Sequence, residues 1–337
     1  MNVTWARMLG ILLLVMILPL ATLAGRADAQ ESRMVRLSFG SGWDALPAIV
    51  ALERGFFAQE GLIVSGLAIS SGEAVMGSLV SGSTDIALMP QRTFLIMAAA
   101  QFPVKAIAVG GWGTEMELVV NAGSTVKAVA DLKGKKIGIT PGSEAFPVLI
   151  RLLNQAKLRP TDVQIVQMSG EQLTQAFAQS LADAVFETRH FTTPLVQNGN
   201  AVVVVKPADV TKAIGSISGR PLVAGNKVIE TEPDTVQRAV NAWITALHYI
   251  QQDPEDAARL LRIFFNRQGV TVTLEMAKAW VGYNRYDLYS WSNAAVADAE
   301  YNGWGLKAGQ ILKVEPKLAG YFENRFANAA VKKQGGS

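Results

Sequence analysis

The sequence contains no cysteine. This absence excludes disulfide bonds, cysteine nucleophiles, thiolate metal sites and the cysteine to which a lipoprotein anchor is attached. Histidine is nearly absent as well, because only His190 and His248 occur. His248 lies within a helical apolar pattern, so a Ser-His-Asp triad or a histidine-rich metal site has little to be built from. We therefore expect no catalysis, no metal and no cofactor.

Neither sign of charge dominates the chain. Lysine and arginine number 31, aspartate and glutamate number 28, and the net charge is only +3. The basic residues are scattered, whereas nucleic-acid binding needs a basic patch or stripe, so we expect no nucleic-acid partner. Half of the 337 residues are apolar, which is enough to bury one large domain or two medium ones.

A long apolar run occurs only near the start of the chain. Arg7 precedes the run Leu9–Leu23, and the small-x-small pattern Ala27–Ala29 follows it. This order is typical of a secretory signal peptide. The run of about 15 residues is short for a membrane span of roughly 20, although an uncleaved anchor is the alternative. We expect residues 1–29 to be removed, which would leave an unlipidated protein in the periplasm.

Beyond residue 35, short apolar runs alternate with helical patterns, which predicts βαβ units and parallel sheets in an α/β fold. The apolar runs predict strands at 35–39, 62–69, 85–89, 104–109, 136–139, 163–168, 184–186, 201–205 and 221–224. The spacing of apolar residues, together with proline and glycine punctuation, predicts helices at 46–54, 73–81, 94–100, 147–155, 171–181, 233–250, 254–265, 274–281 and 318–326.

The order of these elements predicts two doubly wound lobes. The chain passes to the second lobe near Glu117–Asn121 and returns near Gly219–Ala224, after a connection of small residues at 215–219. We therefore expect residues 30–118 and 222–337 to form lobe 1 and residues 119–221 to form lobe 2. Two crossings make a hinge with a cleft beside it, and open α/β sheets bind ligands in the loops beyond their strand ends.

Four loops between a strand and a helix carry small, hydroxyl or amide groups. Unpaired backbone N–H groups at a helix start attract anionic or polar groups, glycine allows close approach, and serine or threonine adds a hydroxyl. The alternative is that the hydroxyl residues only cap their helices. The candidate ligand-binding residues in these loops are Ser41, Gly42, Ser70, Ser71, Gly72, Gln91, Thr140, Gly142 and Ser143.

Two tryptophans lie in predicted loops at strand ends. The flat faces of Trp43 and Trp112 could enclose an apolar or planar ligand, and the alternative is ordinary packing.

Charged residues of both signs follow the same strand ends. Arg92 and Arg189 are candidate partners for a carboxylate or sulfonate, unless Arg92 is only a solvated residue of a first helical turn. Asp44 and Glu187 would instead favour a cationic group, so the charge of the ligand stays open. We expect Trp112→Ala or Arg189→Ala to weaken ligand binding without unfolding the protein.

At these residues the sequence resembles the periplasmic solute-binding proteins of the aliphatic-sulfonate, nitrate, taurine and thiamine-precursor group. The likeness covers most of the chain beyond the signal peptide and is carried by the segments Leu46–Leu62, Ser71–Ala74, Leu79–Ala87, Asp131–Ile139 and Pro233–Leu261. The resemblance implies a type II periplasmic-binding fold, closure of two lobes on a ligand, and delivery of that ligand to an ABC transporter permease in the inner membrane. We also expect a monomer.

One segment departs from the family pattern. The family usually continues from an Asp-Ala pair into an aromatic residue, an acid and a proline, whereas Asp183-Ala184 here leads to Thr188, Arg189 and His190 at those places. This departure puts a standard family ligand in doubt. An arginine in place of an acid would favour an anionic or neutral ligand over an amine.

The leading hypothesis is a solute-binding protein without catalysis, which captures a small anionic or polar organic molecule. A second hypothesis is an enzyme on the same fold, such as a desulfinase or a thiamine-pyrimidine synthase. Those relatives use cysteine in their chemistry, and this chain contains no cysteine. A third is a ligand sensor that docks onto a membrane receptor, and a neighbouring histidine-kinase gene rather than permease and ATPase genes would favour it.

Overall fold

A computed structural model describes residues 33–140, 143–214 and 219–335. The predicted signal peptide at 1–29, the candidate residue Gly142 and the connection at 215–218 lie outside the described residues. None of the helices in the described ranges is long and apolar enough to cross a membrane.

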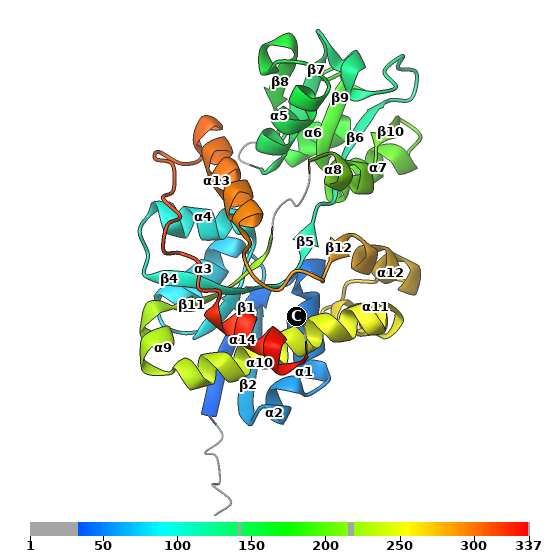
Figure 1. Ribbon diagram of the computed structural model, residues 1–337. Coiled ribbons are helices and arrows are strands. Elements are labelled where there is room, and N and C mark those ends of the chain that lie inside the picture. Colours follow the sequence, from blue (N-terminus) through cyan, green and yellow to red (C-terminus); the bar gives the residue numbers. More distant parts are fainter. Residues whose placement is uncertain (1–32, 141–142, 215–218, 336–337) are drawn as a thin grey trace, which may run out of the picture. The chain divides into compact units, whose positions relative to one another are not determined.

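The first lobe is built on a sheet with the strand order β2-β1-β3-β11-β4 (Figure 1). Its strands are β1 (Arg33–Gly40), β2 (Leu62–Ile69), β3 (Ile86–Leu88), β4 (Val104–Val109) and β11 (Pro221–Gly225). Its helices are α1 (Leu46–Glu53), α2 (Phe56–Gln59), α3 (Gly72–Val80), α4 (Gln91–Ala99), α9 (Asn226–Thr231), α10 (Pro233–Gln252), α11 (Pro254–Arg267), α12 (Leu274–Gly282), α13 (Asn293–Ala308) and α14 (Arg325–Lys333).

The second lobe has a sheet with the order β10-β6-β9-β7-β8. Its strands are β6 (Met116–Asn121), β7 (Lys136–Ile139), β8 (Gln164–Gln167), β9 (Ala184–Thr188) and β10 (Ala201–Val205). Its helices are α5 (Ala145–Gln155), α6 (Gly170–Gln175), α7 (Arg189–Gln197) and α8 (Pro207–Ile214). Short 3-10 turns lie at η1 (Trp43–Ala45), η2 (Val129–Leu132) and η3 (Pro160–Asp162).

Both sheets are mixed rather than wholly parallel. The strands β1, β2 and β3 pair in parallel, as do β7, β8 and β9. The exceptions are β11, which is antiparallel to β3 and β4, and β6, which is antiparallel to β9 and β10. These two strands follow the two crossings between the lobes. A strand that enters from the other lobe has no local helical crossover, and that crossover is what makes neighbouring strands parallel.

Helices cover both faces of each sheet, as a doubly wound architecture requires. In the first lobe, α1, α10 and α11 pack around one core, and α3, α4 and α13 contribute to another. In the second lobe, α5 and α8 cover one face and α6 and α7 the other. A small antiparallel pair, β5 (Trp112–Gly113) with β12 (Asn284–Arg285), lies beside the first crossing. The predicted lobe boundaries, 30–118 with 222–337 and 119–221, remain our proposal.

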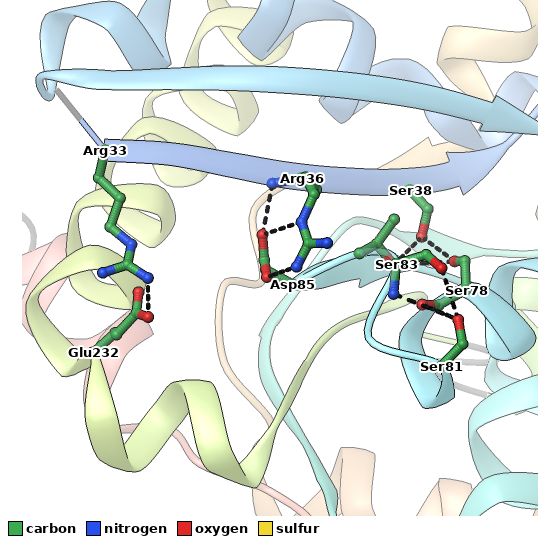
Figure 2. Close-up of polar contacts among 9 residues, drawn as sticks. Arg33, Arg36, Ser38, Ser78, Ser81, Ser83, Asp85 and Glu232 are labelled. Atoms are coloured by element: carbon green, nitrogen blue, oxygen red, sulfur yellow. Dashed lines mark hydrogen bonds and ion pairs between the residues drawn. The ribbon is translucent and has the colours of Figure 1, made fainter.

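Polar contacts fasten α3 and the loop after it to β1 (Figure 2). The Arg36 guanidinium donates to both carboxylate oxygens of Asp85, at 2.6 and 3.1 Å. Next to this pair, the Ser78 hydroxyl donates to Ser38 at 3.0 Å, and Thr84 lies within hydrogen-bonding distance of both serines. Asp85 belongs to the segment Leu79–Ala87, which resembles the family. These contacts give it a structural role in the first lobe, near the starts of β1 and β3.

The helix predicted at 318–326 is wrong. Residues 318–324 are irregular, with turns at 319–320 and 324 and one isolated bridge between Phe322 and Ala106, and α14 begins only at Arg325. The predicted helix at 171–181 is too long, because α6 ends at Gln175. Helix α13 was not predicted, since its buried positions are occupied largely by alanine, glycine, asparagine and aspartate, which leave no apolar period to detect.

Candidate functional site

A cleft of about 1180 Å³ lies where the two lobes meet. Its walls come from the loop after β1, the first crossing, the starts of α5 and α7, and helices α11 and α12. The predicted ligand-binding residues that line it are Gly42, Trp43, Asp44, Arg92, Ser143, Glu187 and Arg189. Lining residues that the sequence did not single out include Thr114, Glu115, Met116, Arg220, Trp280 and Tyr283.

Other predicted residues lie outside this lining. Ser71 caps α3, since its hydroxyl accepts from the backbone N–H of Ala74 at 3.1 Å, which is the capping role considered above. Gln91 is fully buried, and its amide oxygen accepts from Asn302 at 2.6 Å. Ser41, Ser70, Gly72 and Thr140 also do not line the cleft.

Trp112 lies in the core rather than on the cleft wall. Its side chain is only 1% exposed, and its indole N–H donates to the carbonyl of Leu288 at 3.2 Å. Its ring packs against Trp291, with centroids 5.2 Å apart, and Gly219 leaves room for it. The expectation that Trp112 offers a flat face to a ligand is therefore not met, because both faces are enclosed by protein.

Glu187 is fully engaged in holding the loop before α5. One carboxylate oxygen accepts from the Thr140 backbone N–H at 3.1 Å and from the Ser143 hydroxyl at 2.6 Å. The other accepts from the backbone N–H of Thr188 at 2.9 Å. A buried carboxylate with three donors is satisfied by the protein. Glu187 therefore shapes the cleft and positions Ser143.

Arg189 is held by two partners at the start of α7. Its Nε lies 3.4 Å from the buried carboxylate of Glu117, which also accepts from the Thr192 hydroxyl at 2.5 Å. Its guanidinium donates to the hydroxyl of Tyr283 and lies over that ring, 5.1 Å from the centroid. Since Tyr283 follows α12, this contact links the two lobes. The positive charge of Arg189 is thus already balanced by Glu117.

Replacing Arg189 with alanine should lower the free energy of unfolding by about 1–3 kcal/mol, because Glu117 would keep a buried charge without its cation. The double variant Glu117→Gln with Arg189→Ala should recover much of this loss, since no unpaired charge then remains. Urea unfolding of both variants measures the effect. A double variant no more stable than Arg189→Ala would contradict a role for the ion pair.

Arg220 comes from the returning crossing and joins the cleft to the first lobe. Its guanidinium lies over the ring of Trp43, 4.4 Å from the centroid. The same group lies 3.5 Å from the Asp44 carboxylate and donates to Asn284 at 3.1 Å. Its position within the predicted crossing at Gly219–Ala224 was the available sequence signal. Asp44 was predicted as a partner for a cationic ligand group, and the structure places the guanidinium of Arg220 against it instead.

Glu115 lies at the first crossing and differs from the other cleft carboxylates. Burial raises its pKa to about 7 from the ordinary value of 4.5, although Arg220 and Arg189 act in the opposite direction. One of its carboxylate oxygens is buried and receives no hydrogen bond from any described residue. The sequence reasoning missed Glu115, because nothing in the local pattern distinguishes it from a solvated acid.

One wall of the cleft is mainly apolar. Phe265 of α11 and Trp280 of α12 contact each other edge to face, with centroids 5.2 Å apart, and Met276 and Ala279 extend the same surface. Burial raises the pKa of the neighbouring Tyr283, so its hydroxyl stays neutral. This wall can pack against the carbon skeleton of an organic ligand, while the charged groups meet its polar ends.

Two α/β lobes joined by two crossings, with a cleft at the crossings, define the type II periplasmic-binding class of fold. Residues 43–257 match the family described as NMT1/THI5 like. The match spans more than half of the chain, so the protein belongs to this family, and the resemblance inferred from the sequence is confirmed.

Known proteins of two kinds are similar to this chain. The taurine-binding periplasmic protein of Escherichia coli is 23% identical over 244 residues, which are 70% of this chain and 75% of that protein. The crystal structure of the periplasmic aliphatic sulphonate binding protein SsuA from Escherichia coli has a TM-score of 0.71 at 16% identity, covering 88% of this chain and 99% of that one.

The second kind is an enzyme. The crystal structure of the desulfurization enzyme DSZB has a TM-score of 0.64 at 16% identity, covering 90% of this chain and 99% of that one. At these identities the structural likeness shows the fold alone, since one fold supports both binding and catalysis.

Proposed function

We propose that this protein is the periplasmic solute-binding component of an ABC uptake system. It captures a small anionic or polar organic ligand in the cleft and delivers it to a permease in the inner membrane. Membership of the NMT1/THI5-like family and the similarity to taurine- and sulphonate-binding proteins support this proposal.

The observation that carries the proposal is the composition of the cleft walls. Trp43 and Asp44 come from the first lobe, Ser143 and Arg189 from the second, and Arg220 from a crossing. A ligand that contacts both lobes favours the arrangement in which most of these contacts form at once. Such a difference in contacts is what shifts a two-lobed protein from open to closed states.

A ligand that binds only the folded protein should raise the melting temperature in a saturable way. At a concentration about 100 times its dissociation constant, the gain is about 2.7 kcal/mol. Thermal unfolding with a panel of sulfonates, carboxylates, inorganic oxyanions and pyrimidines measures this gain. A panel that gives no saturable shift would remove the main support for the proposal.

The likeness to DSZB makes an enzyme the second candidate. The two candidates differ in what becomes of the bound compound. NMR of the ligand after prolonged incubation with a stoichiometric amount of protein should show it unchanged if the protein only binds it. A turnover product would instead establish an enzyme.

We further propose that the mature chain begins after Ala29, carries no lipid and acts as a monomer without a nucleic-acid partner. The small-x-small pattern at Ala27–Ala29 and the absence of cysteine support the first two points. Mass spectrometry of the protein recovered from the periplasm would test the start of the chain, and light scattering would test the monomer.

A further inference from the structure

Among the described residues that line the cleft, two have a buried side-chain polar atom without a hydrogen-bond partner: Arg92, at Nε, and Glu115, at one carboxylate oxygen. Glu115 is the acid of the two. Its backbone is fixed, because the Glu115 carbonyl accepts from the backbone N–H of Arg189 at 3.2 Å. Its side chain reaches the cleft wall, where one oxygen is buried and no described residue donates to it. Buried polar groups in proteins are nearly always hydrogen-bonded, so this exception needs an explanation.

The charged groups around Glu115 do not supply the missing partner. Its neighbours are two arginines, Arg220 and Arg189, and two acids, Asp44 and Glu117. Each arginine lies against one of those acids, since Arg220 is 3.5 Å from Asp44 and Arg189 is 3.4 Å from Glu117. Within each pair, the positive charge of the arginine is balanced by the negative charge of the acid. Ionised Glu115 is therefore the odd negative charge in a cluster of three acids and two bases.

Aromatic rings stand beside the same cluster. Trp43 and Tyr283 each hold an arginine over the ring, at 4.4 and 5.1 Å from the centroid. Because an arginine already lies over each ring, these rings and the apolar wall of α12 offer packing for the organic skeleton of a ligand, and its cationic group is left to Glu115. Burial raises the pKa of Glu115 to about 7, and a cation bound at its unsatisfied oxygen would stabilise the ionised form.

We propose that Glu115 determines ligand specificity by accepting a hydrogen bond from a cationic nitrogen of the ligand, an ammonium or amidinium group. This inference rests on the proposed function, because it assigns a chemical class to the ligand of the same cleft. The ligand would then be a polar organic molecule with a basic nitrogen and a skeleton that packs against Trp280 and its neighbours. An additional anionic group on the same molecule is compatible with Arg92 elsewhere in the lining.

The opposite arrangement makes a distinguishable prediction. A protonated Glu115 could donate to an anionic group, and an anion would then bind more tightly at low pH. A cationic nitrogen needs ionised Glu115, so the affinity for a cationic ligand should rise as the pH rises through the pKa of Glu115. The direction of the pH dependence therefore distinguishes a cationic ligand group from an anionic one. The other groups that act on Glu115 are the charged Asp44, Glu117, Arg189 and Arg220 and the titratable hydroxyl of Tyr283.

The experiment uses pairs of probes that differ at the nitrogen. These are taurine with ethanesulfonate, benzylamine with benzyl alcohol, and benzamidine with benzamide, and binding is measured by calorimetry and thermal shift. The nitrogen cation of at least one pair should bind about tenfold more tightly than its partner and gain about another tenfold in affinity between about pH 6 and pH 8. The variant Glu115→Gln should lose both gains.

Glu300→Gln is the matched control, because Glu300 is exposed on α13 and lies outside the cleft lining. It removes the same charge and should leave both gains in place. Amine binding that survives Glu115→Gln, or anionic probes that bind more tightly at low pH through Glu115, would overturn the inference but leave solute binding standing. If no probe and no member of the wider panel binds at about 1 mM, the inference and the proposed function both fail.

Discussion

Replacing Trp112 with alanine should lower the free energy of unfolding by about 3–5 kcal/mol. The indole fills a space between the first sheet and the segment after β12, contacts Trp291 and donates to the Leu288 carbonyl. Alanine would leave a cavity and an unsatisfied carbonyl. The sequence-based expectation was the opposite, since it foresaw weaker ligand binding with the fold intact.

Trp304→Ala is the matched control for this prediction. Trp304 also contacts one aromatic ring, that of Tyr301, but it is 39% exposed on α13. Its removal should cost about 1 kcal/mol or less, as is usual for surface substitutions. Urea unfolding followed by circular dichroism gives both values. A loss for Trp112→Ala as small as that for Trp304→Ala would mean that Trp112 does not pack as described.

The contrast between Trp43 and Trp112 shows where sequence reasoning stops. Both tryptophans stand beside glycine at the end of a predicted strand, so their local patterns are equivalent. Their environments differ because Trp291 and Leu288, far along the chain, enclose Trp112, while Arg220 covers one face of Trp43. Contacts between distant segments leave no trace in local spacing.

The fold was more predictable than the site. The strands at 62–69, 104–109, 136–139 and 201–205 have the predicted bounds, because short apolar runs between turn residues mark strands well, including the largely exposed edge strand β2. The direction of β6 and β11 was not foreseen, since pairing direction follows from the route of the chain and not from composition.

Charge at the site was the least predictable property. The sequence showed which arginines and acids stand near strand ends, but not which of them neutralise each other. Arg189 was expected to favour an anion, and yet Glu117 is its internal partner. Asp44 was expected to favour a cation and instead lies against Arg220. Only the spatial pairing shows that the two arginines beside Glu115 already lie against Asp44 and Glu117, while one oxygen of Glu115 receives no hydrogen bond from the described residues.

That surplus charge has a consequence for stability. Glu115→Gln should stabilise the ligand-free protein at neutral and alkaline pH. In the unfolded chain the carboxyl loses its proton near the ordinary pKa of 4.5, whereas burial keeps it protonated in the folded state up to about pH 7. Between these values the unfolded state binds fewer protons, so the stability of the native protein falls as pH rises.

The size of this effect follows from the two pKa values. Each pH unit in that window costs about 1.4 kcal/mol, and the total is at most about 3 kcal/mol because the side chain is partly exposed to solvent. Glutamine does not titrate, so the difference between Glu115→Gln and the native protein should be small near pH 4 and largest above about pH 7. Urea unfolding across this range, with Glu300→Gln as the control, measures it.

A difference that does not change with pH would show that Glu115 titrates normally and has no special environment. If the difference grows as expected while the same variant loses amine binding, one carboxylate lowers stability in the empty cleft and contributes affinity in the occupied one. Binding sites commonly combine these two properties, because a group poised for a ligand is left without a partner in its absence. The pH at which the stability difference stops growing should then coincide with the midpoint of the pH dependence of amine binding, since both are set by the folded-state pKa of the same carboxyl group.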